Sequence, residues 1–66
     1  MTNKLAQTYF NKVLEFFNGD TTKTWTWFKS PNPSLGMVSP LDMVRTGRTI
    51  KLGKHIESAF QGERPL

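Results

Sequence analysis

The chain has 66 residues and a mass of 7.6 kDa, which is enough for one domain and too little for two. It contains no cysteine, which excludes disulfides and cysteine-ligated zinc, and its formal net charge of +4 favours an acidic partner. Since no signal peptide is recognisable and no apolar run approaches the roughly 20 residues of a membrane span, we expect a soluble, cytoplasmic protein.

The first segment has the periodicity of an amphipathic helix. Its apolar residues come in pairs spaced four, four and three positions apart, namely Leu5-Ala6, Tyr9-Phe10, Val13-Leu14 and Phe16-Phe17. Asn18-Gly19 follows, and glycine readily adopts the left-handed conformation that ends helices. The pattern predicts a helix over about residues 3–18.

The second segment, residues 20–30, allows two interpretations. Its Thr-Trp-Thr-Trp run alternates with period two, which is typical of a strand. No second alternating run is present to pair with it, and Asp20 is a good helix N-cap, so we favour a short helix. On that helix Trp27 and Phe28 are expected in the core. Trp25 is expected to be half exposed, either at the edge of the core or as an interface anchor.

A loop is predicted for the middle of the chain, because two prolines keep residues 30–33 extended. The apolar residues that follow, 35–38, again allow two interpretations. Met37 and Val38 either plug the core or contact a partner, since methionine adapts readily at binding surfaces.

A short third helix is predicted next. Its first residues, Ser-Pro-Leu-Asp at 39–42, combine a good N-cap, a proline at the first helical position and an acidic residue placed to reach back to the cap. We expect this helix to turn Leu41 and Val44 inward and to end at Thr46-Gly47.

The last helix is predicted over about residues 49–61. Its apolar stripe consists of Leu52, Ile56, Ala59 and Phe60, and its opposite face carries Arg48, Lys51, Lys54, His55 and Ser58. Gly53 lies at the edge of the stripe, where we expect the backbone of a neighbouring segment to approach closely.

The basic face of this helix also allows two interpretations. It is either a solvated outer surface or a contact for phosphates or for an acidic protein. Ile50 lies outside the apolar stripe and either precedes the helix or contacts a partner.

These elements predict an all-α fold, a compact single domain of about four short helices. Catalysis is not expected, because the only histidine, His55, is placed on the polar face as a solvated side chain and the five carboxylates are dispersed. We therefore expect no catalytic residue, no metal and no cofactor.

An ordered set of short motifs runs through most of the chain. It comprises Trp27-Phe28, Pro31-Asn32-Pro33, Leu35-Gly36, Ser39-Pro40-Leu41-Asp42-Met43-Val44, Gly47-Arg48 and Lys51-Leu52, followed by Ile56 and Gly62. In this order the motifs resemble the toxin-binding domain of Xre/MbcA/ParS-type antitoxins. The resemblance covers about residues 5–62.

The resemblance implies a helical toxin-binding domain over residues 1–62 and a short tail over residues 63–66. Members of this family bind RES-domain toxins, which consume NAD⁺, and neutralise them by occupying the mouth of the active cleft. The C-terminal end of the antitoxin tends to enter that cleft. Carried over, the inhibitory element would contain Arg64, Pro65 and Leu66; the alternative is a frayed chain end.

Two departures from the family pattern bear on function. Typical members carry a helix-turn-helix domain upstream, for which this chain has no room, so we expect a stand-alone copy in which operator binding is in doubt. The frequent Gly-Gly of the family's loop is here Gly36-Met37, which makes the loop more apolar.

The leading expectation is thus an antitoxin-like inhibitor that binds a RES-type toxin. One alternative is a small basic protein that binds nucleic acid or modulates transcription, and another is a phage or mobile-element protein that uses this fold to bind another host protein. A homo-oligomer is compatible with each, and no membrane partner is expected. The expected partner-binding residues are Trp25, Met37, Val38, Arg48, Ile50, Lys51, Lys54, Arg64, Pro65 and Leu66.

Overall fold

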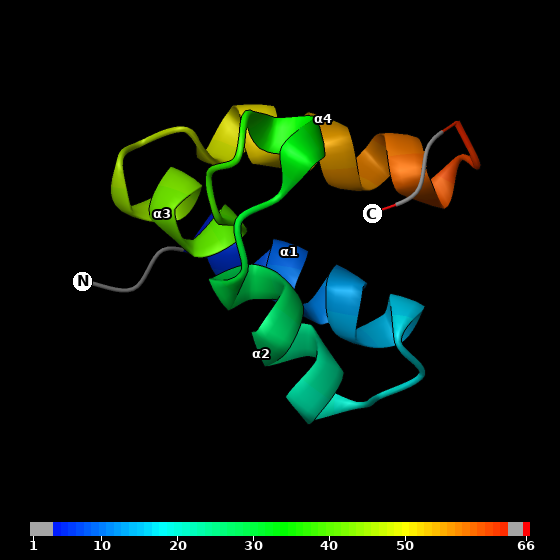
Figure 1. Ribbon diagram of the computed structural model, residues 1–66. Helices are drawn as coiled ribbons and strands as arrows, with labels where there is room; N and C mark the ends of the chain where they lie inside the picture. Colours follow the sequence, from blue (N-terminus) through cyan, green and yellow to red (C-terminus); the bar gives the residue numbers. More distant parts are fainter. Residues whose placement is uncertain (1–3, 64–65) are drawn as a thin grey trace.

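The computed structural model describes residues 4–63 and residue 66. Within them the chain forms four α-helices and one short 3-10 helix, namely α1 (Lys4–Phe16), α2 (Thr21–Lys29), η1 (Pro33–Leu35), α3 (Pro40–Arg45) and α4 (Thr49–Phe60). In Figure 1, α4 lies across the top of the molecule, α1 and α2 lie below it, and α3 closes the left end. The predicted all-α single domain of about four helices is confirmed.

The second segment is a helix, as favoured over a strand. A carboxylate oxygen of Asp20 accepts a hydrogen bond from the Lys23 amide at 3.0 Å and so caps α2. The Thr24 hydroxyl donates to the main-chain oxygen of Asp20 at 2.8 Å. Thr24 and Phe28, four positions apart, both face the core, whereas Trp25 faces outward. The Thr-Trp alternation therefore does not mark a strand: on the helix Thr24 is buried and Trp25 and Thr26 are exposed.

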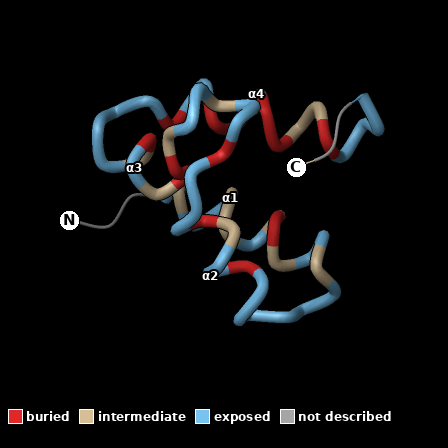
Figure 2. Tube along the Cα trace, in the orientation of Figure 1, coloured by how far each residue is buried: buried red, intermediate tan, exposed pale blue. Residues whose placement is uncertain are grey.

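The core receives at least one side chain from each α-helix. Figure 2 shows the buried positions gathered where the helices face one another. The buried cluster consists of Val13, Phe28, Met43, Leu52 and Ile56, and Trp27 packs against it half-buried. The predicted core position of Phe28 is therefore confirmed, and Trp27 lies at the margin.

The third helix begins as predicted, but its inward face includes a residue that was not predicted there. The Ser39 hydroxyl accepts a hydrogen bond from the Asp42 amide at 3.2 Å. Val44 packs half-buried against the core, as predicted, and Leu41 is also half-buried. The residue of this helix that is fully buried is Met43, which the prediction did not include. On so short a helix the buried Pro40, three positions before Met43, sets the inward face.

The contact between α1 and α4 is held at two points. Lys12 forms an ion pair with Glu57 at 2.6 Å, and its ammonium lies 5.4 Å from the centre of the Phe60 ring. Further along, α4 is closely approached at Gly53, as predicted, but the approaching group is the phenol ring of Tyr9 and not a backbone. Phe60, predicted to belong to the apolar stripe, is 40% exposed.

No described helix combines the length and the apolar character that crossing a membrane requires.

Candidate functional site

The loop between α2 and α3 is organised around Asn32, which is buried. Its side-chain oxygen accepts a hydrogen bond from the Ser34 amide at 2.9 Å and so caps η1. Its main-chain amide donates to the Val38 oxygen at 3.2 Å, and its main-chain oxygen accepts from the Met37 amide at 2.9 Å. Asn32 therefore closes the loop and fixes the backbone that carries Met37.

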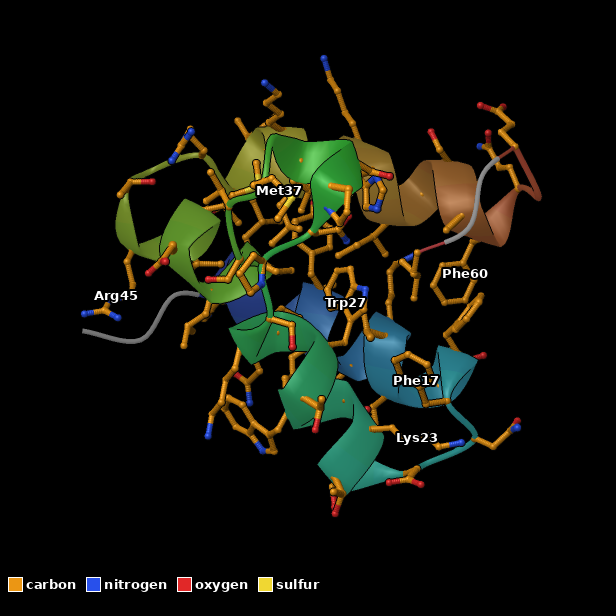
Figure 3. The ribbon with its side chains drawn as sticks, in the orientation of Figure 1. Phe17, Lys23, Trp27, Met37, Arg45 and Phe60 are labelled. Atoms are coloured by element: carbon orange, nitrogen blue, oxygen red, sulfur yellow. The ribbon has the colours of Figure 1, made fainter. Side chains whose placement is uncertain are left out.

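Gly36 and Met37 follow each other in the left-handed region, with φ angles of 74° and 65°. For a residue with a Cβ this conformation costs about 1–2 kcal/mol. Met37, which is labelled in Figure 3, is nevertheless 64% exposed. Val38 is half-buried and packs against the core. Of the two interpretations of this loop, a plug describes Val38, whereas Met37 is left for solvent or a partner.

Leu66 is docked against the body of the domain. Its side chain packs against the buried cluster. Its main-chain oxygen lies 2.8 Å from Asn32 Nδ2, 3.4 Å from Trp27 Nε1 and 3.4 Å from His55 Nε2. Three donors from three separate segments thus meet at one oxygen; we call these three side chains the Leu66 site.

The prediction that His55 is a solvated side chain was wrong. His55 is 5% exposed, and its ring lies parallel to that of Trp27, with the ring centres 6.5 Å apart and the planes 10° apart. At about 100° per residue, His55 lies roughly 60° from Leu52 on the helical wheel. It therefore borders the buried stripe, and classifying it by its polarity alone placed it on the wrong face. Its buried Nδ1 has no hydrogen-bond partner among the residues that the structure describes.

A shallow hollow of about 190 Å³ separates η1 from the outward side of α4. We call it the η1–α4 hollow; it is lined by Ser34, Leu35, Lys51, Lys54, His55 and Ser58. Two of the predicted basic residues, Lys51 and Lys54, therefore lie together, and both are exposed. Among the described residues neither forms an ion pair with a carboxylate.

Trp25 belongs to a different surface. It lines an apolar groove of about 380 Å³ between α1, α2 and α3. Its indole packs against the Phe10 ring, with ring centres 4.8 Å apart, and the Lys29 ammonium lies 5.6 Å from the indole. Trp25 remains 46% exposed, so the expectation of a half-exposed indole is confirmed.

The remaining predicted residues lie around the start of α4 or outside the described part. Ile50 is 67% exposed within the first turn of α4, and the Arg48 Nε donates to the Thr46 hydroxyl at 3.1 Å. Arg64 and Pro65 lie outside the described residues. The described members of the predicted set are thus divided between the groove of Trp25, the loop of Met37, the start of α4, the η1–α4 hollow with Lys51 and Lys54, and the Leu66 site.

The carboxylates that the structure places are mostly engaged in holding the fold. Asp20 caps α2, Glu57 pairs with Lys12, and Asp42 lies 3.7 Å from the Arg45 guanidinium. Within residues 4–63 and 66, no three His, Cys, Asp or Glu side chains gather as a metal site would require.

Comparison with protein-family models, with curated proteins and with solved structures found no match for this chain.

Proposed function

We propose that this chain is a non-catalytic binding module that neutralises a RES-type, NAD⁺-consuming toxin by covering the mouth of its active cleft. The proposal starts from the ordered motifs that resemble the toxin-binding domain of Xre/MbcA/ParS-type antitoxins. In the structure, three residues of these motifs determine the shape of one loop. Asn32, Gly36 and Ser39 supply the two caps and the left-handed turn that shape the loop of Met37.

The observation that supports the proposal is that Met37 is exposed and has a left-handed backbone conformation. Glycine would fit its backbone without strain, and a side chain that is 64% exposed adds little to the core. Folding therefore gives no reason for a methionine at this position. A partner that covers Met37 gives one, because the flexible thioether side chain packs well on irregular protein surfaces.

The non-catalytic part of the proposal is supported by the use of the charged groups. The carboxylates of Asp20, Asp42 and Glu57 are committed to a cap or an ion pair, and His55 is buried against Trp27. A general base must reach the proton that it removes. The three carboxylates lie apart on separate elements, and His55 borders the η1–α4 hollow but is only 5% exposed.

The test is co-expression of the whole chain with a RES-type toxin, with cellular NAD⁺ and growth as readouts. We expect the chain to preserve both, and the purified proteins to form a complex. Met37→Gly should weaken the complex by about tenfold, as for the truncation of an apolar interface side chain worth about 1.4 kcal/mol. Because this change relieves the backbone, loss of binding cannot be assigned to unfolding.

The matched control is Leu5→Ala, which shortens an exposed apolar side chain on α1. It should leave affinity for the toxin within about twofold, since truncations outside an interface are close to neutral. Absence of both a complex and rescue would refute the proposal. The tail is tested separately with Leu66→Gly: rescue equal to that of the unchanged chain would exclude Leu66 as an inhibitory contact.

A second candidate function, nucleic-acid binding, is favoured by one observation: Lys51 and Lys54 lie beside the η1–α4 hollow and form no ion pair with a described carboxylate. Phosphate contacts of this kind weaken steeply with salt, because neutralised phosphates release counterions. Replacing Arg48, Lys51 and Lys54 by serine should abolish binding to duplex DNA or RNA at low ionic strength. A chain that shifts no duplex under those conditions excludes this candidate.

A further inference from the structure

The Leu66 site joins donors from three segments that are far apart in sequence. Trp27 comes from α2, Asn32 from the loop before η1, and His55 from the middle of α4. An oxygen can only accept a hydrogen bond, so the proton on the His55 ring that faces Leu66 belongs to Nε2. All three side chains then present N–H groups to the same point.

The three donors are held in place independently of Leu66. The Asn32 side-chain oxygen is fixed by the Ser34 amide, and its main chain by hydrogen bonds with Val38 and Met37. The rings of Trp27 and His55 lie parallel at 6.5 Å, and Trp27 meets Phe28 edge-on at 5.0 Å. Because the surrounding packing sets the direction of each N–H, the site is preorganised for an acceptor.

These donors need an acceptor at this position. Asn32 and His55 are both more than nine-tenths buried, and a buried N–H without a partner carries the full cost of its desolvation. Among the described residues, Leu66 is the acceptor for all three. It fills the site incompletely, however, since two of its three contacts are 3.4 Å long, at the upper limit for a hydrogen bond.

The space beside the oxygen is apolar, because the Leu66 side chain packs there against the buried cluster. A ligand for the site must therefore combine a main-chain oxygen with an aliphatic side chain. We infer that the Leu66 site binds a peptide segment with a leucine-like side chain, and that the chain's own Leu66 occupies it until such a segment displaces it. This inference does not depend on the identity of the partner proposed above.

The test uses the full chain and the pentapeptide Gly-Glu-Arg-Pro-Leu, which repeats residues 62–66. The probe is the Trp27 indole N–H, followed by NMR. In the Leu66→Gly variant we expect this N–H to lose its protection from solvent exchange, because the aliphatic anchor is gone. Adding the peptide should then restore the signal of the unchanged chain with saturable binding. The unchanged chain should bind the peptide at least about tenfold more weakly, since its site is occupied.

Two controls make the result specific. A peptide that ends in glycine should not bind, and Asn32→Asp in the Leu66→Gly chain should abolish peptide binding by removing the shortest donor contact. Asn11→Asp, the same change on an exposed position of α1, should leave it intact. The inference is overturned if Leu66→Gly leaves the indole N–H protected. It is equally overturned if the N–H opens and the peptide fails to bind, or if the glycine peptide binds as well. Toxin neutralisation can succeed or fail whatever the outcome, so the two proposals are tested separately.

Discussion

The phenol ring of Tyr9 lies directly over the α-carbon of Gly53, so that a methyl group at residue 53 would overlap the ring. This contact brings α1 against α4 at a point where any side chain on α4 would hold the two helices apart. Gly53 is buried in the middle of its helix, where glycine ordinarily destabilises a helix by about 1 kcal/mol relative to alanine. The close approach of Tyr9 explains why glycine is present here.

Gly53→Ala is therefore expected to destabilise the protein. Overpacking against Tyr9 should cost about 1–3 kcal/mol, which exceeds the gain of about 1 kcal/mol in helix propensity. Urea unfolding monitored by tryptophan fluorescence measures the difference. In a Tyr9→Leu background, where the side chain is too short to overlap, the same change should be stabilising. An equal effect in both backgrounds would show that Tyr9 is not the reason for the glycine.

Met37→Gly is expected to stabilise the protein, in contrast to Gly53→Ala. Relief of the left-handed backbone should stabilise the fold by about 1 kcal/mol, because the lost side chain is mostly exposed. Gly36→Ala, at the neighbouring left-handed residue, should destabilise by a similar amount. Thermal unfolding of the two variants checks both signs. A destabilising Met37→Gly would mean that the side chain contributes to the core, and the argument for a partner would lose its basis.

His55 is expected to tolerate an aromatic replacement better than its burial suggests. His55→Phe keeps a ring beside Trp27 and removes the unpartnered Nδ1, at the loss of one long contact to Leu66. We expect a change within about 1 kcal/mol, whereas His55→Ala leaves a cavity and should cost about 2–4 kcal/mol. Chemical denaturation of both variants decides the point. Equal losses would indicate that the ring nitrogens, and not the packing, hold this part of α4.

The helices were predictable because their signals are local. The pairing of apolar residues in the first segment, the Asp20 cap and the Ser39 cap each act within four residues, and all are present in the structure. The choice of helix over strand for α2 followed from the lack of a pairing strand. For a short helix, the sequence alone determines the inward face less well. In α3 the positions of α2 and α4 decide that Met43 is the buried side chain.

The candidate sites were less predictable because they depend on contacts between distant segments. Trp27 and Leu66 are 39 positions apart in sequence, and no periodic pattern connects an indole with a main-chain oxygen. His55 was assigned to solvent by its polarity, although its spacing from Leu52 and Ala59 places it beside the buried stripe. The sequence indicates Met37 as a contact residue, whereas its left-handed backbone conformation is seen only in the structure.

The ion pair between Lys12 and Glu57 leads to a prediction for alkaline pH. The hydrogen bond to the Glu57 carboxylate raises the pKa of the Lys12 ammonium above its ordinary value of 10.5. A group whose pKa is higher in the folded chain stabilises the fold while it is protonated in both states. That contribution is present below about pH 10.5 and is lost as the pH rises through the folded value.

The unchanged chain should be more stable than Lys12→Met at pH 8. This difference in stability should become smaller as the pH is raised to about 11, near the ordinary pKa of lysine. Lys23→Met is the matched control, because Lys23 forms no ion pair with a described carboxylate and should show a difference that does not depend on pH in this way. The effect should be small and should shrink in high salt, since the pair is exposed and its attraction is screened. Urea midpoints across this pH range, at low and high salt, measure it. A difference between Lys12→Met and the unchanged chain that stays constant up to about pH 11 would show that the Glu57 contact does not stabilise the packing of α1 on α4.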